Sequence, residues 1–159
     1  MSARRATLPA LATAALLTGA MDARSQATQS DVAPRFVGAW RYVGTTIDGV
    51  PKPRGNDPKG MIYYGPHGEM SVQIAPDVER KKAGAVMTAD EAKIAVTNYV
   101  AYFGTYTIDE KAQLVTHHRA ASLQPGDVAA VVRRYEFVGD RLILRPPNST
   151  QEITWERIK

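Results

Sequence analysis

The sequence predicts an all-β fold of eight antiparallel strands with one inserted α-helix. Three observations support this class. Short runs rich in aromatic and β-branched residues recur from Gly38 to the C-terminus, turns containing Gly, Pro, Asn or Asp separate them, and one segment carries a helix start signal. Evenly spaced strands of this number in hairpin succession form an up-and-down barrel or a sandwich, and periodicity leaves both open.

The first three predicted strands precede the helix. The first covers 40–47 (WRYVGTTI), and it ends at the turn pair Asp48-Gly49, after which a loop rich in Pro and Gly extends to residue 59. The strands at 60–64 and 69–75 flank Gly65-Pro66-His67-Gly68, which is typical of a hairpin. The loops at 48–59 and 76–87 could each form a lid, and composition does not decide this.

A capping box predicts where the helix begins. The side chain of Thr88 can bond to the backbone of Glu91, and the Glu91 side chain can reach back to Thr88. Apolar residues then recur at three-to-four spacing on one helix face: Ala92, Ala95, Val96 and Tyr99. We expect the helix to end near Val100 and to cover an open end or a seam of the sheet.

Five further strands follow in close succession. They are predicted at 102–108, 114–119, 128–138, 141–144 and 151–158. The turns between them are the charged loop 109–112, the segment 124–127, the pair Gly139-Asp140 and the segment 146–149. The Gly-Asp pair is a strong two-residue hairpin signal.

The N-terminal segment has the layout of a secretory signal. Arg4 and Arg5 precede an apolar stretch over 6–21, and small residues flank Gln26 in a cleavage-site pattern. The stretch is shorter than the roughly 20 residues that span a bilayer. We predict a signal peptide over 1–27 cleaved after Ala27 (with Ala20 and Ala23 as alternatives), a flexible lead-in over 28–35, one domain over 36–159, and a periplasmic or secreted product.

Composition excludes several classes of protein and site. With 159 residues, 44% of them hydrophobic and 23% charged, the chain is an ordinary single globular domain. It contains 0 cysteines, which excludes disulfides, thiolate metal sites, thiol catalysis and a lipid anchor on cysteine. Removing residues 1–27 takes away three arginines and one aspartate, so the formal net charge falls from +4 to +2. No basic stripe is present, and we expect neither nucleic acid as a partner nor a membrane anchor.

The three histidines do not form a set of metal ligands. His67 lies in a turn, and the neighbours His117 and His118 face opposite sides of a strand, so that they cannot bind one ion together. We therefore expect no metal, and we expect no cofactor.

Motifs spread along the chain indicate a family. Gly38-Ala39-Trp40 opens the first strand and Arg157 lies near the end of the last. The matching segments follow in order: 37–41, 57–60 with 62–63, 68–73, 99–108, 115–118 and 133–137. Together they resemble the bacterial lipocalin-like domain family of the calycin superfamily, from about residue 36 to 158. The resemblance implies an eight-stranded antiparallel up-and-down lipocalin-like barrel with a central cavity. It also implies that Gly38, Trp40 and Arg157 close one end, with the guanidinium across the indole. It implies no particular reaction.

Alternation along the strands selects candidate cavity residues, because a barrel of this size holds side chains or one small ligand. The apolar content of 131–137 places the Tyr135 face inside, and Arg133 with it. One of His117 and His118 must face the interior, as must one of Tyr63 and Tyr64; we take His118 and Tyr63 as the candidates. The candidate cavity residues are Tyr63, Tyr102, Tyr106, His118, Arg133 and Tyr135.

These side chains are compatible with three functions. A buried Arg can hold a carboxylate or enolate oxygen, a His can move a proton near neutral pH, and Tyr hydroxyls can orient a carbonyl. We predict a secreted protein that binds a small, mostly apolar molecule able to carry one carbonyl or carboxylate. The alternatives are an isomerase or cyclase acting through His, Tyr and Arg, and an envelope interaction protein whose barrel is filled by its own side chains. No catalytic residue is assigned.

Overall fold

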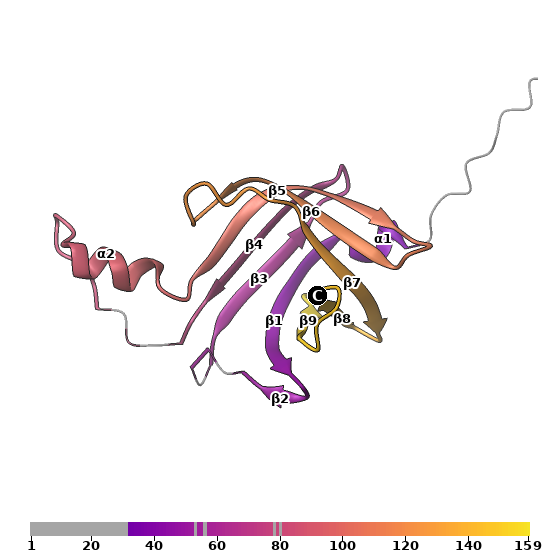
Figure 1. Cartoon of the computed structure of the whole chain (residues 1–159), viewed down its shortest axis with the longest axis horizontal. Helices are drawn as coiled ribbons and strands as arrows, with labels where there is room; N and C mark the ends of the chain where they lie inside the picture. Colours follow the sequence, from indigo (N-terminus) through magenta and orange to yellow (C-terminus); the bar gives the residue numbers. More distant parts are fainter. Residues whose placement is uncertain (1–31, 53, 56, 78, 80) are drawn as a thin grey trace, which may run out of the picture.

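The computed structural model describes residues 32–159 except 53, 56, 78 and 80. The predicted signal peptide, its cleavage site and the start of the lead-in lie outside these residues. The described chain forms α1 (Ala33–Phe36), β1 (Gly38–Ile47), β2 (Val50–Pro51), β3 (Lys59–Tyr64), β4 (Glu69–Ala75), α2 (Ala89–Val96), β5 (Val100–Asp109), β6 (Leu114–Ser122), β7 (Val131–Val138), β8 (Arg141–Arg145) and β9 (Glu152–Arg157) (Figure 1).

Eight of the strands close into an antiparallel up-and-down barrel, which confirms the predicted fold class. The strand order is β1-β3-β4-β5-β6-β7-β8-β9, and β1 pairs with β9 to complete the ring. The short β2 folds back on the end of β1, at Thr46↔Pro51 and Ile47↔Val50, within the segment predicted as a loop. Closure removes the exposed strand edges that a sandwich would retain.

The core lies inside the barrel, because successive residues of a strand face opposite sides of the sheet. In β4, Met70, Val72 and Ile74 are buried, whereas Glu69 and Gln73 are exposed. A bulge between β5 and β6 alters this alternation: Gly104 pairs with Arg119, and Phe103 pairs with Ala121, so that Ala120 is an extra residue. A Cβ at Gly104 would lie 2.0 Å from the His118 carbonyl oxygen, so only glycine fits where the two strands approach here.

The short helix α1 and the first residues of β1 fill one end of the barrel, which we call the closed end. The Phe36 side chain is 0% exposed and packs edge-on against the rings of Tyr64, Tyr135 and Phe137. The Phe36 carbonyl accepts a hydrogen bond of 2.8 Å from the Trp40 indole N–H. Residues 33–35, predicted as part of a flexible lead-in, are therefore helical and lead directly into the core.

Gly38, Trp40 and Arg157 lie at this closed end, as the resemblance implies. The Arg157 guanidinium carbon is 4.1 Å from the centre of the Trp40 ring, and Nη1 donates to the Val37 carbonyl at 2.9 Å. Gly38 adopts φ +127°, and a Cβ there would lie 3.1 Å from Arg157 Nη1. Glycine thus permits both the backbone conformation and the close approach of the guanidinium.

The helix α2 differs from its prediction in length and position. The capping box is confirmed, because Thr88 accepts from the Glu91 backbone and the Glu91 side chain accepts from the Thr88 backbone. The helix ends at Val96 instead of near Val100, since Thr97 is extended and Asn98 has φ +58°. None of its residues is buried, and it stands clear of the barrel in Figure 1. It therefore does not cover an end or a seam.

The observed limits of β7 also correct a prediction. This strand begins at Val131 and not at residue 128, because the chain at 128–130 belongs to the connection from β6. The helices among the described residues are too short and too polar to cross a membrane.

Candidate functional site

His117 lies at the centre of the polar cluster inside the barrel. It projects inward from β6 and is 1% exposed. Its Nε2 lies 2.7 Å from the Tyr64 hydroxyl of β3, and its Nδ1 lies 2.9 Å from the Tyr102 hydroxyl of β5. One imidazole thus links two phenols that approach from different strands of the barrel.

Burial keeps all three members of this cluster neutral. Loss of solvent, with smaller electrostatic contributions from Arg133 and His118, lowers the pKa of His117 to about 3. Burial also raises the pKa of Tyr64 and of Tyr102, and Arg133 opposes part of that rise. At neutral pH the cluster therefore consists of an uncharged imidazole and two protonated phenols, which act as hydrogen-bonding groups.

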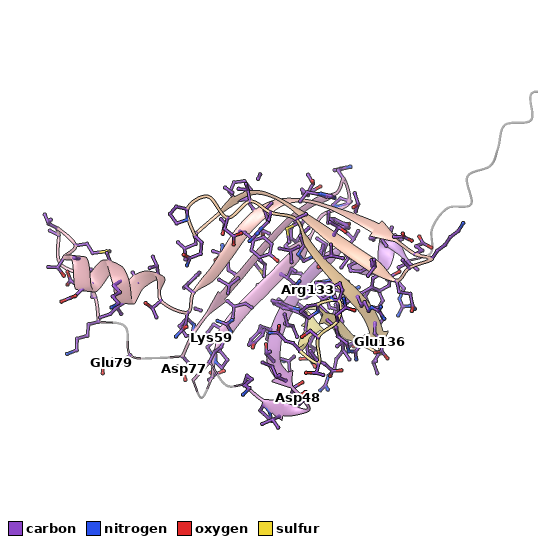
Figure 2. All side chains as sticks on the ribbon, viewed as in Figure 1. Asp48, Lys59, Asp77, Glu79, Arg133 and Glu136 are labelled. Atoms are coloured by element: carbon purple, nitrogen blue, oxygen red, sulfur yellow. The ribbon has the colours of Figure 1, made fainter. Side chains whose placement is uncertain are left out.

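Arg133 supplies the positive charge beside this cluster. It comes from β7, as does Glu136 (Figure 2). The two residues are three positions apart, so they face opposite sides of the sheet. Burial lowers the Arg133 pKa, whereas the neighbouring Tyr102 and Tyr64 raise it. One of its donors, Nη1, bonds to the Val132 carbonyl at 2.8 Å. Among the described residues, no carboxylate forms an ion pair with Arg133, which distinguishes it from Arg119.

Arg119 is already neutralised. Its Nη1 donates to an Asp127 carboxylate oxygen at 2.6 Å, and Nη2 bonds to the other oxygen of the same carboxylate. Its Nε donates to the Ala129 carbonyl at 2.6 Å, and the guanidinium lies 5.6 Å from the centre of the Tyr102 ring. This two-point ion pair ties the connection after β6 to the strand.

A cavity of about 370 Å³ lies at the end opposite α1, which we call the open end. Among the described residues, β6 and β7 pair from Leu114↔Arg134 to His117↔Val131, and β6 continues beyond that point without β7. The cavity occupies this widening. Its lining residues are Arg54, Asn98, Tyr99, Val100, Ala101, Tyr102, Arg119, Ser122, Leu123, Gln124, Asp127, Val131 and Arg133.

A second cavity of about 330 Å³ adjoins the first at the same end. The two share Arg54 and Asn98, and Arg54 Nη1 donates to the Asn98 carbonyl at 2.8 Å. This bond joins the loop after β2 to the segment before β5. The Arg54 carbonyl in turn accepts from the Asp77 backbone at 2.6 Å, so both predicted lid segments contribute to this junction.

The structure brings two of the predicted cavity residues together at the cavity, Tyr102 and Arg133. Tyr106 and Tyr135 also face inward, but they lie in the closed half. The Tyr106 hydroxyl donates to the Gly65 carbonyl at 2.9 Å, and Tyr135 packs against Phe36. Neither lines the cavity.

Tyr63 and His118 face outward and do not reach the interior. Tyr63 is 36% exposed, while Tyr64 beside it is buried. His118 is exposed, and its Nε2 lies 2.9 Å from the Thr107 hydroxyl on the outer face of β5. The physical reason is the two-residue period of the strands, which gives the interior to Tyr64 and His117.

Sequence reasoning also missed Arg54, Asn98 and Arg119 at the open end. The first two lie outside the strands. Arg119 shares the inward face of His117 through the two-residue period, so it was missed when His118 was taken as the inward residue, and the bulge at Ala120 brings Ser122 to the same face. The described residues contain no group of three or more His, Cys, Asp or Glu side chains able to hold a metal ion.

The fold and the interior cluster define a small closed β-barrel with an aromatic closed end and a cavity at the open end. The family model described as a lipocalin-like domain matches residues 37–158. The chain belongs to this family. The match covers every strand of the barrel and all three residues of the polar cluster, Tyr64, Tyr102 and His117. A search of curated proteins finds no match.

Proposed function

We propose that this protein binds a small, mostly apolar molecule in the cavity at the open end of the barrel. The observation that carries the proposal is the cavity at the open end of the barrel, which lies next to the packed core and has Tyr102 and Arg133 among its lining residues. The cavity is near the lower end of the roughly 300–1,000 Å³ that ligand pockets occupy. Val100, Leu123 and Val131 supply apolar lining. The small volume of the cavity suits a compact ligand better than a long acyl chain.

Two further observations support binding over the alternatives. The alternative of an interaction protein requires a barrel filled by its own side chains, and such a barrel would have no cavity of this size. His117, Tyr102 and Arg133 lie close together, which an acid–base enzyme would also need. However, the best general acids and bases have pKa values near the working pH, whereas the His117 pKa is about 3. We also propose a periplasmic or secreted location, which the signal-like pattern over residues 1–27 supports.

Filling the cavity is expected to weaken binding. The neutral fluorescent probe N-phenyl-1-naphthylamine should bind the purified full chain saturably, and Val131→Trp should weaken that binding roughly tenfold or more, which corresponds to about 1.4 kcal/mol. Val131 lines the cavity, and a tryptophan there occupies its volume. Fluorescence titration measures both affinities.

The matched control is Val138→Trp, at the far end of the same strand, where the side chain is 51% exposed. This variant should bind the probe as the wild type does. The proposal fails if the wild type shows no saturable binding, or if a folded Val131→Trp protein binds with unchanged affinity.

A further inference from the structure

The hydrogen atoms of the Tyr64–His117–Tyr102 cluster can be placed by counting donors and acceptors. A neutral imidazole has one N–H donor and one acceptor nitrogen. Tyr64 is 0% exposed, and its hydroxyl has His117 Nε2 as its hydrogen-bond partner within the described chain. If Nε2 carried the proton, the Tyr64 hydroxyl hydrogen would be buried without an acceptor, at a cost of about 1–3 kcal/mol.

In the arrangement that satisfies the buried groups, the hydrogen bonds all donate in one direction, from Tyr64 through His117 to Tyr102. Tyr64 donates to Nε2 of His117, so the imidazole proton resides on Nδ1 and is donated to the Tyr102 oxygen. The Tyr102 hydroxyl hydrogen then has no acceptor on His117. Since Tyr102 lines the cavity, this hydrogen is available to a bound molecule.

The cavity wall is therefore rich in donors and positive charge. Arg54, Arg119 and Arg133 line it together with one carboxylate, that of Asp127. Asp127 is bound by Arg119, which leaves the Arg133 charge without an acidic partner among the described side chains. A guanidinium presents parallel N–H groups that match the two oxygens of a carboxylate.

We propose that the molecule bound in the cavity carries a carboxylate, which Arg133 and the Tyr102 hydroxyl bind together, and that Tyr64 and His117 orient this hydroxyl. The inference rests on the proposed function and names the ligand's chemical class. Tyr64 and His117 are positioning residues, since they act through Tyr102. The apolar body of the ligand then lies along Val100, Leu123 and Val131.

A competition experiment tests the carboxylate. The isosteric pair 2-naphthoate and 2-naphthamide have the same shape and differ in charge, and each is used to displace N-phenyl-1-naphthylamine from the full chain. We expect the carboxylate to compete at least tenfold more strongly than the amide. Arg133→Met should abolish that preference, whereas Arg134→Met, on the outer face of the same strand, should retain it.

Tyr102→Phe should weaken naphthoate binding by a few-fold, the usual effect of one hydrogen bond. Tyr106→Phe is its control, since that hydroxyl lies on the same strand and bonds to the Gly65 carbonyl. Equal competition by acid and amide, or no competition by either, overturns the inference while Val131-dependent probe binding still upholds the proposed function. A carboxylate preference that persists in folded Arg133→Met also overturns it.

The imidazole tautomer provides a readout that does not depend on binding. In a ¹⁵N-labelled His67→Gln/His118→Gln variant, His117 is the remaining histidine, because the chain contains 3. Long-range ¹H–¹⁵N correlation spectra should show the proton on Nδ1 at neutral pH. A proton on Nε2 would overturn the orientation of Tyr102 by Tyr64 and His117.

Discussion

Acidification from pH 6.5 to about 3 is expected to lower the free energy of unfolding by roughly 4 kcal/mol through His117 alone. The unfolded chain takes up a proton on this imidazole near its ordinary pKa of 6.5, whereas the folded protein does so only near pH 3. Between these values the unfolded state binds more protons, so stability falls as the pH falls, by about 1.4 kcal/mol per pH unit. Urea denaturation at a series of pH values measures the slope.

The comparison that isolates His117 is His117→Gln against His118→Gln. Glutamine offers one acceptor and two donors on its amide, so it can contact both Tyr64 and Tyr102, and it does not titrate. His117→Gln should flatten the pH dependence, leaving the part due to carboxylates such as Asp140 and Glu91, whose pKa values are lowered in the folded protein. His118→Gln removes an exposed imidazole and should keep the wild-type slope. Equal slopes in the two variants would contradict burial of a neutral His117.

Phe36→Ala is expected to destabilise the protein by about 3–5 kcal/mol, the usual cost of removing a fully buried aromatic ring. The ring is 0% exposed and contacts three aromatic rings of the closed end edge-on, with centroid separations of 5.0–5.2 Å. Its removal leaves a cavity beneath α1, which rigid strands cannot close. Denaturation followed by tryptophan fluorescence reports this directly, because Trp40 bonds to the Phe36 carbonyl.

The control for this prediction is Phe103→Ala on β5. Phe103 is 56% exposed on the outer face of the barrel, so truncating it should cost well under about 1 kcal/mol. The midpoint should shift for Phe36→Ala without a change in the denaturant slope. If both variants lose the same stability, α1 is not part of the cooperative core.

The sequence pattern did not predict which side chain of two adjacent pairs faces the barrel interior. Tyr63-Tyr64 and His117-His118 are pairs of like residues, and alternation alone cannot tell which member of a pair faces inward. Pairing between β5 and β6 supplies the missing information: Tyr106 lies opposite His117, and Thr105 lies opposite His118. Once Tyr106 is placed inside, an even-numbered hairpin loop after Asp109 places His117 inside as well. The sequence therefore contained this signal for the β5–β6 hairpin.

The helices show a different limit. The start of α2 was predictable, because a capping box is a local arrangement of two side chains and neighbouring backbone groups. The position of α2 away from the barrel was not predictable. An apolar stripe indicates that a helix can pack against another element, but it does not identify that element. In α1, four residues are too few for a periodic pattern, yet they position Phe36 in the core.

Local chemistry within the sequence by itself determined the eight barrel strands to within a few residues and the capping box. The spread of matching segments indicated the lipocalin-like family, with Gly38, Trp40 and Arg157 at one end. These features depend on neighbouring residues or on one repeated period. The tertiary structure alone decided that Arg133 has no acidic partner among the described side chains, that Arg119 has one, and that a cavity lies at the open end. Those features arise where strands distant in sequence meet, and where β6 and β7 separate, so burial and pairing there depend on the closed barrel and not on any single segment.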